Sequence, residues 1–426
     1  MSFDIYDVCI IGAGASGMIA AIESSRRGLS AVVMEKNRKP GRKLYATGNG
    51  RCNITNLKMD ETYYFSLYNK PFDGGRLACD SFVEEVYGVL AQKTGVSPAE
   101  FIESYFGELG LSLRNHDGYV YPASMQASSV VWALTDMLRH YGVEIRCGET
   151  ATSIEYTDDI YIVTADTGTV IRSRSLILAA GSPAGSGVGA ATSPEIGKLL
   201  NCLGVNYVPF KPCLCPMSTD TDISRISGVR ARCVVSLYSS NGELFCSEEG
   251  EVNFTDYGIS GIVIFNLTCC YTKDCYITLN LIPEVSRDAF TAATCGMREK
   301  SPERRTVALL NGYINDKLAA YIVDNTIGET GTKIGDISSS DIEALYDACT
   351  SLRFDISGTG GFDKSQSSLG GVLTENINAC NMQVVYPDAG NLYITGELLD
   401  VAGKCGGYNL TFAFITGYLA GNGVLR

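Results

Sequence analysis

Two short hydrophobic runs near the N-terminus flank a longer stretch of mixed polarity. Residues 4–11 and 29–34 are rich in valine and isoleucine, which is typical of parallel strands buried on both faces. The stretch between them, from about Ala15 to Arg27, predicts a helix that begins at a cluster of glycines. Strand, helix and strand in this order predict the start of a doubly wound α/β sheet.

The cluster of glycines has the spacing of a dinucleotide-binding turn. We expect Gly12 to permit the tight turn, Gly14 to let a pyrophosphate approach the backbone, and Gly17 to let helix and strand pack closely. The free N–H groups at the helix N-terminus, around Ser16, would face the phosphates. Glu35 ends the second strand, where an acid binds an adenosine ribose hydroxyl. The complete order of elements favours a dinucleotide site over a chance glycine-rich turn.

Basic residues and glycines follow Glu35. Lys36, Arg42 and Lys43 can neutralise a pyrophosphate, and the glycines around Gly50 suit a loop whose backbone presses against a planar ligand. The alternative is a solvated basic loop. The position of the loop directly after the ribose-binding acid favours ligand contact.

The pattern of residues 63–178 predicts helices followed by strands. Residues 63–110 alternate helical periodicity with glycine breaks, and a helix is expected over 126–141, where Trp132 should pack against other side chains rather than stack on a cofactor. The strands expected next are 143–146, 151–156, 161–165, 170–172 and 175–178. The last of them ends at Ala180-Gly181, and this return to a glycine turn after a meander is typical of two-dinucleotide-binding proteins.

The pattern changes again beyond residue 205. Residues 205–282 alternate apolar and polar positions between turn residues, which predicts a β-rich region, and residues 286–346 return to helical periodicity. A strand at 392–395 then runs into Gly396-Glu397, and a glycine-rich stretch at 403–410 opens a last helix. We expect these closing segments to meet the N-terminal ones at the same ligand.

The composition of the chain limits the kinds of partner that it can be expected to bind. The chain has 34 basic and 47 acidic residues, and its net charge of −13 works against broad, non-specific adhesion to nucleic acid or anionic membranes, although a local basic patch is compatible with it. No signal-peptide pattern and no apolar run of about 18 residues occurs, so we expect a cytoplasmic protein without a membrane partner. The 16 cysteines lack the spacing of a zinc site and only 2 histidines occur, so we expect no metal.

Four segments together resemble a known family. They are residues 12–17, 41–56, 250–261 and 395–410, and they are similar to the BaiN/RdsA-type NAD(P)/FAD-dependent oxidoreductases, or YhiN-like flavoproteins. The resemblance covers essentially the whole chain. It implies an α/β fold in which a Rossmann-like, two-dinucleotide-binding FAD domain carries an inserted β-rich domain and a small helical subdomain. The expected boundaries are 1–190 with 365–426 for the FAD domain, 191–285 with 350–364 for the β-rich substrate domain, and 286–349 for the helical cap.

The resemblance also implies a set of FAD contacts. They are Gly12, Gly14, Ser16, Gly17, Glu35, Lys36, Arg42, Lys43, Gly50, Arg51, Cys52, Ala180, Gly181, Gly396, Glu397, Gly407, Tyr408, Asn409 and Leu410. The chain departs from the usual family pattern at four positions. Ser182 replaces a common glycine, Gln126 a lysine, Asp256 a histidine and Ile262 a proline. The changes at Gln126 and Asp256 put a basic substrate contact there in doubt.

The activity that the family implies is the reduction of activated C=C bonds. Hydride would pass from NADH or NADPH, a transient visitor, through the flavin to the acceptor, and one protein acid would deliver a proton. Cys52, Tyr408 and Cys405 are the candidates by motif position, with structural packing as the competing role for each.

Three functions remain open at this point. The first is reduction of a small steroid-like or bile-acid-like enone, which the acidic composition favours. The second is reduction of a uridine in 23S ribosomal RNA to dihydrouridine. The third is a flavin-bearing binding or electron-transfer protein without catalysis.

Overall fold

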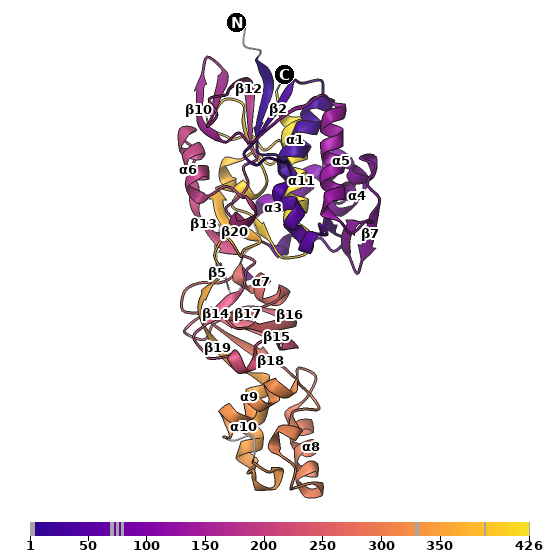
Figure 1. Cartoon of the computed structure of the whole chain (residues 1–426), viewed down its shortest axis with the longest axis vertical. Helices are drawn as coiled ribbons and strands as arrows, with labels where there is room; N and C mark the ends of the chain where they lie inside the picture. Colours follow the sequence, from indigo (N-terminus) through magenta and orange to yellow (C-terminus); the bar gives the residue numbers. More distant parts are fainter. Residues whose placement is uncertain are drawn as a thin grey trace. The chain divides into compact units, whose positions relative to one another are not determined.

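A computed structural model describes residues 5–68, 81–328, 332–386 and 389–425, together with the backbone of 72–73 and 76–77 (Figure 1). The chain divides into two compact units. Unit 1 comprises residues 1–71, 78–212 and 362–426, and unit 2 comprises residues 72–77 and 213–361. The first and last parts of the sequence therefore share one unit, and unit 2 is largely an insertion between them.

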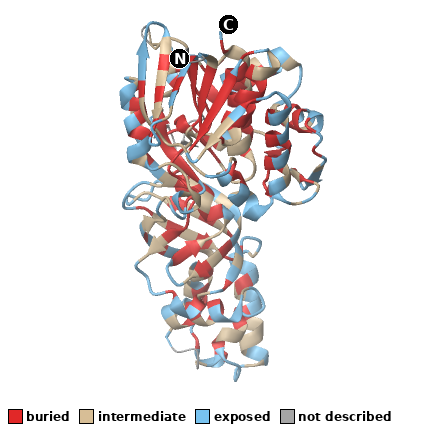
Figure 2. Cartoon of the chain, turned by 45° about the horizontal axis from the view of Figure 1, so that its top comes forward, coloured by how far each residue is buried: buried red, intermediate tan, exposed pale blue. Residues whose placement is uncertain are grey.

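Unit 1 is built on a mixed sheet whose middle strands are parallel. Its strand order is β10-β11-β12-β1-β2-β9, and β21 also pairs in parallel with β12. The strands are β1 (Tyr6–Ile11), β2 (Ala31–Glu35), β9 (Glu144–Cys147), β10 (Ala151–Thr157), β11 (Ile160–Ala165), β12 (Val170–Leu178) and β21 (Leu392–Ile394). All of β2 and β21 is buried, as Figure 2 shows for the centre of the sheet, because helices cover this region.

The helices of unit 1 come from distant parts of the sequence. They are α1 (Ala15–Arg26), α2 (Arg42–Ala46), α3 (Ser81–Thr94), α4 (Pro98–Glu108), α5 (Ala127–His140), α6 (Ser193–Cys202) and α11 (Tyr408–Gly423). Helices α1 and α11 pack very closely, since a Cβ on Gly417 would lie 2.3 Å from the Ser16 carbonyl oxygen. This contact joins the two ends of the chain beside the central sheet (Figure 1).

Small two- and three-stranded sheets complete unit 1. They are β3 (Thr55–Asn56) with β8 (Tyr119–Pro122) and β7 (Leu113–His116), β4 (Tyr64–Phe65) with β22 (Ala402–Gly403), and β13 (Tyr207–Cys213) with β20 (Ser367–Val372). The pairing of β4 with β22 is a second link between N-terminal and C-terminal segments.

Unit 2 consists of a closed antiparallel barrel and helices. The barrel order is β14-β17-β16-β15-β18-β19. Its elements are β14 (Met217–Thr219), β15 (Arg230–Tyr238), β16 (Leu244–Thr255), β17 (Gly258–Ser260), β18 (Tyr276–Asn280), β19 (Leu352–Thr359), α7 (Ile262–Thr268), α8 (Arg287–Lys300), α9 (Asp316–Thr326) and α10 (Ser339–Thr350), with a short hairpin of β5 (Phe72–Asp73) and β6 (Arg76–Leu77).

The structure differs from the sequence-based expectation at several places. The expected strands 170–172 and 175–178 are one strand, β12, because its first half pairs with β11 and its second half with β1. Helix α7 lies inside the region expected to be β-rich, and it packs on β16. The Trp132 prediction is wrong, because that side chain is 59% exposed on α5.

The domain boundaries are a further point of comparison. The expected boundary after residue 190 assigned the segment 193–202 to the β-rich domain, whereas α6 belongs to unit 1, where it packs on β10. Helices α8, α9 and α10 fall in unit 2 together with the barrel, and the division into three domains stays a prediction. Part of the helical region expected at 63–110 lies outside the described residues. None of the described helices is both long and apolar enough to cross a membrane.

Candidate dinucleotide site

The glycine turn after β1 gives each of its three glycines a different role. Gly12 has a φ of +107°, and a Cβ there would lie 2.4 Å from the Ala179 carbonyl oxygen. A Cβ on Gly17 would lie 1.9 Å from the Gly12 carbonyl oxygen, so this glycine permits the close approach of helix and strand. A Cβ on Gly14 would meet no described atom within 4 Å. The turn therefore packs through two glycines and presents the third to open space.

The N-terminus of α1 is free to bind an anion. Within the described part of the chain, no side chain caps Gly14 and no acidic residue occupies the first helical turn. The first N–H groups of a helix have no partner within the helix, and their partial positive charge attracts phosphate groups. Ser16 at this position lies against the C-terminal segment, because its Oγ accepts a hydrogen bond from Thr395 Oγ1 at 3.1 Å.

Glu35 is held directly beside the glycine turn. The carboxylate is buried, and Oε2 accepts the Ala13 N–H at 2.8 Å. Oε1 accepts the Asn37 N–H at 2.8 Å and the Asn37 side-chain amide at 2.6 Å. A carboxylate has about four acceptor positions, so these three bonds fix its orientation and leave capacity for a ligand hydroxyl.

The basic residues after Glu35 contact protein groups. Lys36 Nζ donates to the Ala190 carbonyl at 3.0 Å and forms an ion pair with Glu195 at 3.1 Å. Arg42 Nε donates to the Val188 carbonyl at 3.0 Å. These contacts hold the loop 185–190 beside the segment that follows Glu35. The ligand contacts of Lys36 and Arg42 stay a prediction, and the structure gives both side chains a role in bracing this loop.

A polar network joins four segments that are far apart in the sequence. Lys43 Nζ pairs with Glu397 at 2.5 Å, and Ser367 Oγ donates to the other Glu397 oxygen at 3.3 Å. Asn409 accepts the Gly403 N–H at 2.8 Å and donates to the Gly403 carbonyl at 2.8 Å. Ser367 Oγ also lies 3.4 Å from Asn409 Oδ1, so the predicted residues Lys43, Glu397 and Asn409 belong to one network. Ser367 was not predicted, because no local pattern indicates its contact. Gly403 lies in the predicted 403–410 stretch, but its bonds with Asn409 were not predicted.

The start of α11 rests on the loop that contains residues 52–56. Gly407 has a φ of +95°, and a Cβ there would lie 2.7 Å from the Thr55 carbonyl carbon. Asn56 donates to the Gly406 carbonyl at 3.1 Å, and Thr411 Oγ1 donates to Thr55 Oγ1 at 2.8 Å. This packing brings the predicted Gly407 and the 41–56 segment together.

The remaining predicted contacts lie around these elements. Gly396 adjoins Ser16, since a Cβ on it would lie 2.8 Å from Ser16 Oγ. Gly50 and Arg51 are exposed, whereas Ala180, Gly181 and Leu410 are half-buried. A Cβ on Gly181 would meet no described atom within 4 Å, as at Gly14. A second open position therefore follows the strand that adjoins β1.

The three candidate proton donors lie in different environments. The Cys52 thiol is fully buried, and burial raises its pKa to about 11. Tyr408 is buried, and its hydroxyl donates to the Lys58 carbonyl at 3.2 Å. Cys405 is half-buried, and its Sγ contacts Gln366 Oε1 at 3.7 Å. Cys405 is thus the least buried of these three residues.

Six buried side-chain oxygens have no hydrogen-bond partner among the described residues, and two of them, which the sequence reasoning did not single out, lie next in sequence to Cys52 and Ser367. They are Asn53 Oδ1 and Ser368 Oγ, in residues that are 8% and 1% exposed. A buried polar atom without a partner is costly unless a ligand or water satisfies it. Asn53 lies within the 41–56 segment, which was the available sequence signal. The orphaned acceptor, the open glycines and the uncapped α1 fit a polar dinucleotide such as FAD.

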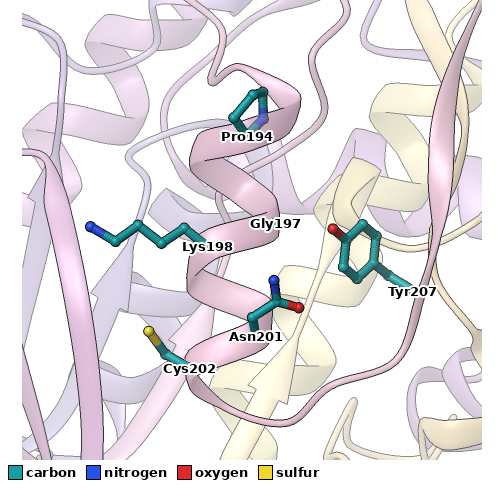
Figure 3. A pocket seen from close by; sticks show the side chains of 6 residues that line it. All are labelled: Pro194, Gly197, Lys198, Asn201, Cys202 and Tyr207. Atoms are coloured by element: carbon teal, nitrogen blue, oxygen red, sulfur yellow. The ribbon is translucent and has the colours of Figure 1, made fainter.

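A separate hollow of about 550 Å³ lies on α6. Its lining residues are Pro194, Gly197, Lys198, Asn201, Cys202 and Tyr207 (Figure 3). None of the predicted site residues lines it, so it is distinct from the candidate dinucleotide site. Among the described residues, no group of His, Cys, Asp or Glu side chains has an arrangement that could hold a metal ion.

Comparisons with known proteins show which proteins the chain is similar to. Residues 6–423 match the family model of the HI0933-like protein Rossmann domain. The chain is 31% identical to a 3-dehydro-bile acid delta(4,6)-reductase of Clostridium scindens, over 97% of each chain. It is 25% identical to a ribosomal RNA dihydrouridine synthase of Escherichia coli, over 96% of this chain and 95% of the relative. A solved flavocytochrome c3 fumarate reductase covers 99% of this chain and is itself covered to 78%, at 13% identity and a TM-score of 0.48.

Proposed function

The chain belongs to the HI0933-like family, and from this premise we propose that it is an FAD-dependent oxidoreductase that uses NAD(P)H to reduce an activated C=C bond of a small enone. The observation that carries the cofactor assignment is the glycine turn, in which Gly14 faces open space while Gly12 and Gly17 are closed by packing. The relative with 31% identity, a bile acid reductase, supports the substrate class.

The cofactor would be held by both ends of the sequence. The α1 N-terminus and Gly14 would bind the pyrophosphate, and Glu35 would accept a ribose hydroxyl. The Lys43–Glu397 pair and the start of α11 would hold the flavin half, and Asn53 Oδ1 offers a further acceptor. When bound, FAD supplies the transfer of hydride from NAD(P)H to the β carbon of the conjugated acceptor.

The chain must also deliver a proton to the α carbon of the acceptor. Cys405 is our proposed donor, because it is the least buried of the three candidates. Burial shields Cys52, and the Tyr408 hydroxyl is bonded to the Lys58 carbonyl, so both contribute to packing. We expect Cys405→Ser to slow oxidation of the reduced enzyme by an enone about 100-fold while reduction by NAD(P)H stays unchanged. Cys202→Ser, at an exposed cysteine of α6, is the matched control.

A second candidate function is reduction of a uridine in 23S ribosomal RNA. The Escherichia coli relative is a ribosomal RNA dihydrouridine synthase, and its similarity also extends over almost the whole chain. The net charge of −13 disfavours RNA as a substrate, because phosphate contacts dominate RNA affinity. The small enone is therefore the primary proposal, and a non-catalytic flavin carrier is the remaining alternative.

One experiment separates the three functions. The purified protein with FAD is reduced anaerobically with NADH or NADPH, and loss of the oxidised-flavin absorbance is recorded. Steroid enones and unmodified 23S rRNA fragments are then added in separate samples. Recovery of absorbance with enones supports the primary proposal, and recovery with RNA together with dihydrouridine formation supports the second. Absence of reduction by either nicotinamide supports the non-catalytic carrier. A colourless protein that does not take up FAD contradicts all three.

A further inference from the structure

Helix α7 of unit 2 lies along strand β16, and two contacts define their register. A Cβ on Gly250 would lie 2.7 Å from Val263 Cγ1, so these residues touch directly. Two positions earlier on the strand, Glu248 Oε2 accepts a hydrogen bond from Asn266 Nδ2 at 3.2 Å. Because alternate residues of a strand share a face, Gly250 and Glu248 both face α7.

The next position on the strand and the next position along the helix are both cysteines. Cys246 lies two residues before Glu248 on β16 and therefore faces the same side. Cys270 lies four residues after Asn266, and its N–H donates to the Leu267 carbonyl at 3.0 Å, which continues the helical turn beyond α7. Strand positions 250, 248 and 246 thus lie opposite positions 263, 266 and 270 of the helical segment. This register places the two thiols near each other.

The environment of the thiols agrees with this register. Cys246 is half-buried and Cys270 is 6% exposed. The neighbouring Cys270 thiol is the largest cause of a raised pKa at Cys246, and burial is the second. Cys246 and Cys270 are both free thiols, with no disulfide between them.

We propose that Cys246 and Cys270 are a redox-active dithiol that closes to an intramolecular disulfide in exchange with a small disulfide such as oxidised glutathione. The half-buried Cys246 thiolate attacks one glutathione sulfur, which forms a mixed disulfide and releases one glutathione thiol. Cys270 then attacks the Cys246 sulfur and releases the second glutathione. The two protein thiols lose two hydrogen atoms and two electrons in total, and the glutathione disulfide gains them.

The bond would close a loop that contains the 250–261 segment, one of the four segments that carry the family resemblance. It would also anchor the end of α7 to the barrel. Because thiolate is the attacking species, the raised pKa predicts slow exchange at neutral pH and faster exchange as the pH rises. The site would therefore respond to sustained oxidation rather than to brief exposure.

Peptide mapping tests the proposal on the full-length holoprotein. The protein is incubated with oxidised glutathione at pH 7 and pH 9, blocked with N-ethylmaleimide under denaturing conditions, and digested with trypsin and a glutamate-specific protease. Cleavage at Glu243 and Glu248 separates Cys246 from the fragment that contains Cys269 and Cys270. We expect a cross-linked pair that lacks two hydrogen atoms, and its yield should increase at least fivefold from pH 7 to pH 9.

The variants distinguish this pair from its neighbours. Cys246→Ser and Cys270→Ser should abolish the cross-link, whereas Cys269→Ser and Cys202→Ser should retain it. The two serine variants at the pair should bind FAD with wild-type affinity, so that a lost cross-link is not confused with misfolding. A cross-link that moves to Cys269, or a stable glutathione adduct at Cys246 without ring closure, would overturn the proposal.

Discussion

Helices α1 and α11 of unit 1 both begin at an uncapped glycine, but the two glycines have opposite surroundings. At the start of α1, Gly14 has a φ of −87° and faces open space. At the start of α11, Gly407 has a φ of +95° and rests on the backbone of Thr55. The same pattern of a glycine before a helix thus leaves open space in one case and permits chain packing in the other.

The difference shows that a glycine-rich turn does not by itself define a ligand contact. The α1 turn is local, because β1, the glycines and β2 follow one another in the sequence. The α11 turn depends on residues more than 300 positions away, as the hydrogen bonds from Asn56 to Gly406 and from Thr411 to Thr55 illustrate. Substitutions should therefore change ligand affinity at α1 and stability at α11.

The largest change in the free energy of unfolding is expected for a substitution at Gly407. Gly407→Ala should lower the free energy of unfolding by about 3 kcal/mol, because it adds a clash with Thr55 to an unfavourable left-handed backbone conformation. Urea unfolding of the protein without FAD measures this change. A loss below about 1 kcal/mol, with weaker FAD binding instead, would show that the start of α11 is mainly a ligand contact.

Cys52, in the loop on which α11 packs, should make the free energy of unfolding decrease at alkaline pH. Burial raises the pKa of Cys52 from 9.0 to about 11, so the folded state holds the thiol proton more tightly than the unfolded state does. The contribution of Cys52 to stability is complete below pH 9 and is lost as the pH rises through 11, which amounts to about 2 kcal/mol at pH 11. Unfolding of wild type and Cys52→Ala between pH 7 and pH 11 tests this. Parallel stability curves for the two proteins would contradict it.

At Gly14 we expect a loss of FAD affinity with little change in stability, which is the reverse of the result expected at Gly407. Gly14→Ala should change the free energy of unfolding by less than about 0.5 kcal/mol, because its Cβ meets no described atom and its backbone conformation suits alanine. FAD affinity should fall by about 10- to 100-fold, because the methyl group occupies the space of the pyrophosphate. Flavin fluorescence titration measures the affinity. Unchanged affinity would remove α1 from the cofactor site.

A smaller effect on affinity is expected at Glu35. Glu35→Gln keeps one acceptor oxygen and loses the charge that orients the Ala13 and Asn37 N–H groups. FAD affinity should fall about tenfold, which is the loss of one charge-assisted hydrogen bond. The same titration checks it, and Glu149→Gln, which changes a carboxylate two residues beyond the end of β9, is the control. Equal losses in both variants would indicate a general charge effect.

Much of the candidate site could be predicted from the sequence, because many of its residues lie close together along the chain. The family membership and the α/β, Rossmann-like fold were predicted correctly, and the separation of roles among Gly12, Gly14 and Gly17 follows from their spacing after a strand. The contacts of Lys36 and Arg42 with the 185–190 loop could not be predicted, because their partners lie about 150 residues away and carry no charge pattern that marks them. Asn53 was inside a recognised segment, but only its burial identified the unpaired oxygen.

The sequence alone determined the βαβ start, the glycine turn and the acid at Glu35, because these features depend on short-range backbone geometry and on the period of hydrophobic residues. Tertiary structure decided which thiols are shielded and how Lys43, Glu397 and Asn409 meet. It also set the register of α7 on β16, from which we infer that Cys246 and Cys270 are neighbours. These properties arise from packing between distant segments, and packing is fixed only when the whole chain has folded.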